Sequence, residues 1–168
     1  MTGVHIRHCI RNGFYAIIQR SCFGFDITCV FSVITTVAEL MTADPLCVTR
    51  DASLKDAHDL MREKNIRHIP VIDASGELVG MLTQKIMVAK VMSLMAQYGA
   101  TALERKEKQQ LVADMMATDF AAVTPEQSLT EVAGFFVKNR HGCMPVVDEN
   151  NKLKGILTSS DFVRLAAE

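Results

Sequence analysis

Residues 68–83 read HIPVIDASGELVGMLT, and residues 143–158 read CMPVVDENNKLKGILT. The two stretches lie 75 positions apart, and at that offset residues 37–86 align with residues 112–161 without a gap and with 15 identical pairs. Self-similarity at a fixed spacing indicates two copies of one folding unit, and two copies are too few for an open solenoid. The repeat therefore predicts a closed pair of units related by a pseudo-twofold axis.

Each copy shows the same order of elements. In the first, a short strand at residues 48–49 precedes a helix that Ser53 and Asp56 open as a capping box. Two strands follow, joined by the turn-forming residues 73–76, and a helix closes the unit. The order strand, helix, strand, strand, helix predicts an α/β fold (α+β in some schemes), with small mixed sheets covered by helices on one side.

The second copy repeats these elements, with a strand at residues 123–124 and a capping box from Ser128 to Glu131. The paired strands are predicted at residues 68–72, 77–82, 143–147 and 152–157. The first helix of each copy should bury one apolar stripe, formed by Leu54, Ala57, Leu60 and Met61 and by Leu129, Val132, Phe135 and Phe136.

Two segments between the copies have opposite compositions. Residues 86–97 read as a helix that is apolar nearly all round and rich in methionine. This favours a position between the two copies or at the seam of a dimer. Residues 101–110 are charged and polar, so we expect a solvated linker there, which is compatible with a helix.

Composition excludes several classes of function. The 168 residues carry a formal net charge of -1, so no basic field recruits nucleic acid. The apolar stretch at residues 27–37 is too short to span a bilayer, and we expect no membrane segment or secretory signal. The cysteines are odd in number and lack CxxC spacing, which predicts free thiols in the cytoplasm and no metal site: Cys9, Cys22, Cys29, Cys47 and Cys143.

Four stretches of the first copy together resemble a CBS domain: VAELMT from residue 37, DASLKDA from 51, IRHIPVID from 66 and GELVGMLT from 76. Residues 112–166 resemble a second CBS domain that ends in GILTSSD. The likeness covers about three quarters of the chain. The chain also resembles stand-alone bacterial proteins of the acetoin-utilisation type, at GCMPVV from residue 142 and SDFV from residue 160.

The resemblance implies a domain layout and a class of function. It implies CBS domains at residues 37–98 and 112–168, a linker at 99–111 and an N-terminal segment, residues 1–36, of unknown role. Tandem CBS pairs are regulatory modules that form homodimers through their helices and need no cofactor. The implied ligand is an adenosine compound, namely AMP, ADP, ATP, NAD(H) or S-adenosylmethionine, and an unidentified partner protein would be regulated in trans.

The motif GILTSSD marks the expected ligand site. It runs from a strand into a helix, whose N-terminus favours an anion. By the resemblance, Thr158 holds the phosphate and Asp161 the ribose hydroxyls. Met144 and Ile156 would contact the adenine. Backbone groups from Ala122 to Thr124 could form hydrogen bonds with its edge. Thr-x-x-Asp at a helix start is equally an ordinary capping box that needs no ligand.

The first copy lacks this carboxylate, because Ile86 stands where the second copy has Asp161. It offers basic residues instead. In the gamma subunit of AMP-activated protein kinase, which the tandem resembles in architecture, one copy supplies the ribose Asp and its partner supplies phosphate-binding groups. Arg67, His68 and Lys85 would then clamp the phosphate across one asymmetric site. The alternative is that these are solvated surface charges and a structural histidine.

Catalysis has little support in the sequence. His141 and Cys143 could form an activated nucleophile pair, but no third orienting group is evident. Neither an acid–base pair nor a Gly-rich phosphate loop is present, so we expect no enzymatic activity. Two main hypotheses remain, an adenosine-ligand sensor and a ligand-free dimerisation or interaction module.

Overall fold

The structure is a computed structural model that describes residues 34–140 and 142–167. The chain divides into two units, residues 1–35 and 36–168, and all the helices and strands described below belong to the second unit. Most of the N-terminal segment lies outside the described residues, as do His141 and the cysteines at positions 9, 22 and 29. Among the described residues, no helix is long and apolar enough to cross a membrane. The same residues contain no group of three or more His, Cys, Asp or Glu that could hold a metal ion.

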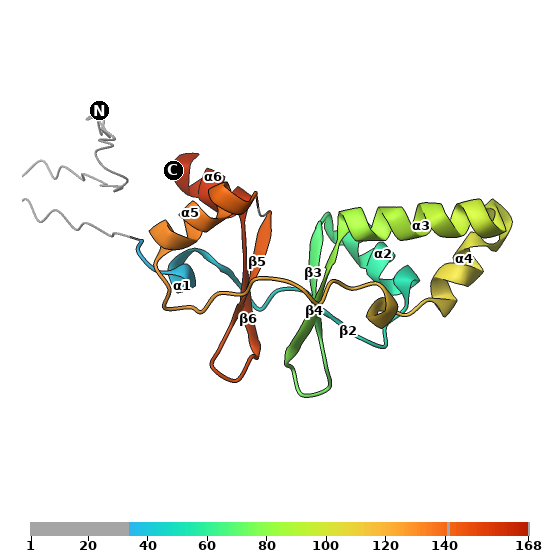
Figure 1. The fold of residues 1–168 in the computed structure, drawn as a ribbon, viewed down its shortest axis with the longest axis horizontal. Coiled ribbons are helices and arrows are strands. Elements are labelled where there is room, and N and C mark those ends of the chain that lie inside the picture. The colour runs from blue at the N-terminus through green and yellow to red at the C-terminus, as the bar shows by residue number, and fades with distance from the viewer. Residues whose placement is uncertain (1–33, 141, 168) are drawn as a thin grey trace, which may run out of the picture. The chain divides into compact units, whose positions relative to one another are not determined.

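The predicted repeat is confirmed, and the fold is α/β (Figure 1). The first copy contains β2 (Val48–Thr49), α2 (Leu54–Lys64), β3 (His68–Ile72), β4 (Leu78–Thr83) and α3 (Gln84–Tyr98). The second contains α5 (Leu129–Asn139), β5 (Cys143–Val147), β6 (Leu153–Thr158) and α6 (Ser159–Ala167). The remaining elements are α1 (Val37–Leu40), β1 (Thr42–Ala43), α4 (Ala100–Gln109) and the 3-10 helix η1 (Val112–Asp114). Helices α2 and α5 have bounds 75 residues apart, and so have the two strand pairs.

Each copy builds one small sheet. In the first, β3 pairs in parallel with β2 and antiparallel with β4, so the sheet is mixed as predicted. In the second, β5 and β6 are antiparallel, and the predicted strand at residues 123–124 is reduced to a parallel bridge between Val123 and Val146. Prolines Pro70 and Pro145 are buried at equivalent positions in β3 and β5.

The two copies exchange their opening segments along the sheet edges. Strand β1, from the start of the first copy, pairs with β6 of the second, with Thr42 opposite Ile156. At the equivalent positions, Ala117 and Met81 of β4 exchange two backbone hydrogen bonds of 2.9 Å. Each copy therefore completes the sheet of the other.

The same exchange fills the two cores. Val37 is fully buried in the core of the second copy, and Val112 is fully buried in the core of the first. Their backbone amides bind equivalent carbonyls, since Val37 donates to Gln127 at 3.0 Å and Val112 donates to Ala52 at 2.9 Å. Neither copy has a complete core without the other's first residues.

The turns of the two strand hairpins also contact each other. The amide of Leu78 donates to the carbonyl of Asn151 at 3.0 Å, and the Asn151 side-chain amide donates to the carbonyl of Leu78 at 3.0 Å. Next to these bonds lies a small apolar cluster with Met81, Val147 and Ile156. This cluster is the apolar contact between the two hairpins. The hairpins β3–β4 and β5–β6 are drawn next to each other in Figure 1.

The helix starts differ between the copies. Ser53 caps α2 as predicted, because its hydroxyl accepts from the Asp56 amide at 3.1 Å while the Asp56 carboxylate accepts from the Ser53 amide at 3.3 Å. The predicted capping box at Ser128 is wrong, since that side chain makes no cap hydrogen bond to α5. Phe135 was expected in the core but is 39% exposed, because the buried face of α5 is formed by Leu129, Val132 and Phe136.

Helix α3 mainly contacts α4, α2 and β4, so it does not lie between the two copies (Figure 1). The other expected position, at the seam of a dimer, stays a prediction. The expected linker forms helix α4, as its sequence allowed, but it is not fully solvated, because α4 packs on α2 and α3. Glu107 on α4 is buried and its carboxylate lies 3.0 Å from His58 Nδ1 on α2. This hydrogen bond joins α4 to α2 and so helps to hold the α3–α4 hairpin on the first copy.

Two glycines allow the exchanged segments to approach the sheets. A β-carbon on Gly155 would lie 2.5 Å from Met41 Sδ and 3.1 Å from the Thr42 carbonyl oxygen. A β-carbon on Gly80 would meet Met116 Sδ at 2.5 Å, at the equivalent place in the other copy. The repeat thus keeps both glycines for close contact between segments.

Gly155→Ala should destabilise the fold by about 1–3 kcal/mol, because the new methyl group overpacks against Met41 and the Thr42 backbone. Urea unfolding followed by circular dichroism measures this loss. Gly134→Ala is the control, since no atom lies within 4 Å of its β-carbon position in α5. That variant should instead be stabilised by roughly 0.5–1 kcal/mol. Equal effects of the two substitutions would contradict the packing described.

Candidate functional site

The motif of the second copy forms a closed arrangement at the junction of β6 and α6. The amide and the hydroxyl of Thr158 donate to Asp161 Oδ2 at 2.8 and 2.7 Å. Arg164 donates to the other carboxylate oxygen, Oδ1, at 2.7 Å. Asp161 is only 5% exposed. Its carboxylate therefore caps the helix, as the alternative interpretation of this motif expected, and a ribose would have to replace some of these bonds.

The equivalent junction in the first copy has no carboxylate. The Thr83 hydroxyl caps α3 by accepting from the Ile86 amide at 3.3 Å. Ile86 itself packs at the edge of the first core. The two junctions share a backbone but differ in chemistry, as the sequence comparison indicated.

His68 is the basic residue that the structure brings against the second copy. Its ring lies against Gly142, where a β-carbon would be 3.6 Å from His68 Nε2. The Gly142 carbonyl accepts from the Ser159 amide at 3.2 Å, at the first residue of α6. The imidazole of the first copy thus lies near the start of the helix that carries Asp161. A β-carbon at position 142 would make ordinary van der Waals contact with this ring.

Burial sets the protonation of two groups near this junction. It lowers the pKa of His68, and the charge of Arg67 lowers it further, so the imidazole is neutral at pH 7. Burial, followed by the charge of Asp161, raises the pKa of Cys143 to about 12. The Cys143 thiol therefore stays protonated, which removes the thiolate that a nucleophile would need.

The other two basic residues lie elsewhere on the first copy. Arg67 is exposed and lines a groove between α2 and α3, where its carbonyl accepts from the Gln84 amide at 2.8 Å. Lys85 is exposed on the first turn of α3. No contact among the described residues joins either side chain to Thr158 or Asp161.

The expected adenine contacts are divided between two clusters. Met144 is buried in the core of the second copy, whereas Ile156 is buried in the cluster between the hairpins. Thr124 is half-buried, and its amide already donates to Gln127 Oε1 at 3.0 Å. Ala122 is exposed.

Sequence reasoning missed three residues that shape this junction. Gln127 and Arg164 each follow a site residue by three positions, the spacing at which side chains bind within a turn, and this signal was available. Gly142 could be noticed only as the counterpart of Arg67 in the repeat, because its contact with His68 depends on the tertiary structure.

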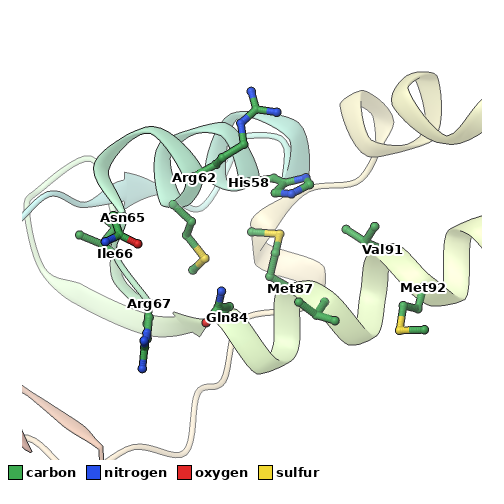
Figure 2. A pocket seen from close by; sticks show the side chains of 11 residues that line it. His58, Arg62, Asn65, Ile66, Arg67, Gln84, Met87, Val91 and Met92 are labelled. Carbon is green, nitrogen blue, oxygen red and sulfur yellow. The ribbon is translucent and has the colours of Figure 1, made fainter.

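A cavity lies apart from this junction, on the first copy (Figure 2). It is a groove of about 430 Å³ between α2 and α3. The residues that line this groove are His58, Met61, Arg62, Asn65, Ile66, Arg67, Gln84, Met87, Val88, Val91 and Met92.

Comparison with solved structures supports the same fold. A crystal structure of a putative acetoin utilization protein (AcuB) from Vibrio cholerae is 34% identical, with a TM-score of 0.66, over 79% of this chain and 90% of that one. CBSX2 in complex with AMP is 29% identical, with a TM-score of 0.65, over 79% and 96%. The CBS domain pair of protein MJ0100, in complex with 5'-methylthioadenosine and S-adenosyl-L-methionine, is 26% identical, with a TM-score of 0.63, over 80% and 97%.

Several curated relatives contain the matched region as one part of a longer protein. The chain spans between 22% and 42% of the length of the first five relatives that it matches, and several of these are named as enzymes. The family model of the CBS domain matches twice, at residues 37–93 and 112–168. These matches cover more than half of the chain and coincide with the two structural copies, so the chain belongs to the CBS domain family.

Proposed function

We propose that this chain is a regulatory sensor of an adenosine ligand, AMP, ADP, ATP, NAD(H) or S-adenosylmethionine, and that it acts in trans on a partner protein. The observation that carries the proposal is the junction where His68 of the first copy contacts Gly142, near Thr158 and Asp161 of the second. The printed ligands of two similar CBS structures, AMP in one and methylthioadenosine with S-adenosylmethionine in the other, support the class of ligand.

The ribose end of the ligand would bind at the start of α6. Asp161 offers two carboxylate oxygens, which suit the two ribose hydroxyls, and the Thr158 hydroxyl is free to rotate from Asp161 toward a phosphate. The positive end of the α6 helix dipole favours the negative charge there. Met144 and Ile156 would contact the adenine, and the backbone from Ala122 to Thr124 would read its edge.

The phosphate end would bind basic groups of the first copy. His68 already lies against the second copy, while Arg67 and Lys85 are exposed and have long side chains that can turn toward a phosphate. A ligand held this way touches both copies, so binding shifts their relative packing, and a partner can read that shift. Because the copies exchange their opening segments, such a shift also moves both sheets.

Regulation through a homodimer in the cytoplasm completes the proposal. Two exposed apolar residues on α3, Met92 and Met95, suit a protein interface. The free thiols of Cys47 and Cys143 suit a reducing compartment.

The second candidate function is a ligand-free interaction module, which the capping role of Asp161 favours. We propose no catalytic role for His141 and Cys143, because the Cys143 thiol is protonated.

Asp161→Asn should weaken AMP binding by about tenfold to a hundredfold, because a neutral amide loses the charged hydrogen bonds to ribose but can still cap α6. Isothermal titration calorimetry of the full chain measures the affinity, and the wild type should bind one AMP per chain. Glu149→Gln removes the same charge from an exposed turn and should bind as the wild type does. Lack of binding of every ligand named above at millimolar concentration would instead support the interaction module.

Arg67→Ala and Lys85→Ala should each weaken AMP binding by about tenfold while leaving adenosine binding unchanged, because each removes a charged contact to phosphate. Competition calorimetry with the two ligands measures the difference. Lys64→Ala, at the exposed end of α2, is the charge-matched control. If all three variants bind AMP with the wild-type affinity, these residues are ordinary surface charges.

AMP binding should tighten as the pH falls from about 8 to about 6. The lowered pKa leaves His68 neutral in the free protein, and a nearby phosphate raises that pKa, so binding takes up a proton. His68→Gln should flatten this dependence while keeping the part that comes from titration of the phosphate itself. Adenosine, which has no phosphate, is the second control. An identical pH profile in the wild type and the variant would remove His68 from the phosphate site.

A further inference from the structure

The Asp161 carboxylate is held by three hydrogen-bond donors of its own copy. Oδ2 accepts two bonds from Thr158, one from the amide at 2.8 Å and one from the hydroxyl at 2.7 Å. Oδ1 accepts a bond from Arg164 at 2.7 Å. Only 7% of the Asp161 side chain is exposed. A ribose can therefore reach this carboxylate only after one of the groups around it has moved.

The three bonds differ in what their loss costs. The Thr158 amide belongs to the backbone where β6 enters α6, so breaking its bond would open the helix cap. The Thr158 hydroxyl is half-buried, so it needs a new acceptor when it turns away, and a phosphate would supply one. The guanidinium of Arg164 passes directly into water, because 63% of that side chain is already exposed. Arg164 is therefore the partner that leaves most easily.

A ligand without a phosphate makes the difference sharper. Thr158 then keeps both of its bonds to Oδ2, and the two ribose hydroxyls have to share Oδ1 of Asp161. A carboxylate oxygen has about two lone-pair positions, so both hydroxyls fit there only when Arg164 occupies neither. With AMP, the Thr158 hydroxyl can turn to the phosphate and vacate a position on Oδ2. Arg164 should thus compete more strongly with adenosine than with AMP.

The repeat separates the arginine from the formation of the helix. At the offset of 75 residues, Asp161 corresponds to Ile86 and Arg164 corresponds to Ala89, so the first copy lacks both members of the pair. Helix α3 nevertheless begins at the same place, capped by the Thr83 hydroxyl. An arginine is therefore not needed to start a helix at this junction, and its bond to Asp161 is available for another role.

We propose that Arg164 is a positioning residue that competes with the ribose for Asp161 Oδ1 and leaves the carboxylate when a ligand enters. The inference rests on the proposed function, because it needs a ribose at Asp161. Asp161 and Arg164 are the charged residues of α6 within residues 159–167, and in the free protein they are paired. Binding thus leaves an unpaired positive charge on the surface of α6, where a partner protein could detect that the site is occupied.

Arg164→Met tests the competition, because it removes the charged donor and keeps an unbranched side chain. In calorimetry of the full chain, adenosine should bind this variant about twofold to fivefold more tightly than the wild type, the size expected for an exposed ion pair. The gain for AMP should be smaller. Arg164→Lys keeps the charge and should bind adenosine nearly as the wild type does. Because Arg164 is exposed, both variants should fold, which circular dichroism checks.

Salt gives a readout that a purely structural role of Arg164 would not change. Raising NaCl from about 50 to about 500 mM screens the ion pair with Asp161. Adenosine is uncharged, so its binding to the wild type and to Arg164→Lys should tighten as the ion pair weakens. Arg164→Met should show no such gain, and the affinities of the three proteins should converge at high salt.

Chemical labelling follows the arginine itself. Phenylglyoxal reacts with guanidinium groups, and mass spectrometry of peptides locates the modified residues. Saturating adenosine should raise the labelling rate of Arg164 by about twofold or more, because binding shifts the population toward the displaced side chain. Arg62 is the matched control, since it pairs with Asp59 at 3.0 Å with the same spacing of three residues. Its labelling should not change.

The outcomes separate this inference from the proposed function. A wild type that binds none of the adenosine compounds at millimolar concentration contradicts both. If the wild type binds AMP but Arg164→Met does not bind adenosine more tightly than the wild type does, the proposed function stands and the competition is wrong. Labelling of Arg164 that adenosine leaves unchanged, in a protein that binds it, would also overturn the inference.

Discussion

The exchange of opening segments holds this molecule together. Val37 completes the core of the second copy and Val112 completes the core of the first, and the strand edges beside them pair across the copies in the same way. Full burial of a valine side chain contributes roughly 1.5–3 kcal/mol, and here that stabilisation is gained only when both copies are formed. The junction near Asp161 and the hairpin contacts therefore occupy a fixed place in a single cooperative unit.

Backbone symmetry and side-chain asymmetry play different parts in this fold. The backbone repeats closely, down to equivalent glycines, turns and hydrogen bonds. The side chains differ at the helix starts, where Ile86 is the counterpart of Asp161, and on the outer helical faces, where the exposed Arg62 is the counterpart of the exposed Val137. Two copies of one scaffold thus present two different surfaces and two different junctions, which one folding unit alone could not do.

Much of the fold was predictable because it depends on local patterns and on the repeat. The strand pairs, the helix α2 with its Ser53 cap and the turns all follow from spacing that the sequence displays. The exchange was not predictable, because the 75-residue offset is the same whether Val37 packs in its own copy or in the other. One of the two positions expected for helix α3, between the copies, was wrong, because its apolar composition did not reveal that α4 would cover one side. At the site, the Asp161 cap followed from motif spacing, whereas the contact of His68 with Gly142 required the assembled copies.

The exchange also has a consequence for the order in which the chain can fold. Val37 finds its core partners among residues 123–157, so its contacts close a loop of more than half the chain. Closing so long a loop costs conformational entropy before the contacts give any stabilisation, and this slows folding. During synthesis, β4 also lacks its neighbour Ala117 until the second copy begins to emerge. The sheet of the first copy therefore keeps an unpaired edge until the second half of the protein has been synthesised.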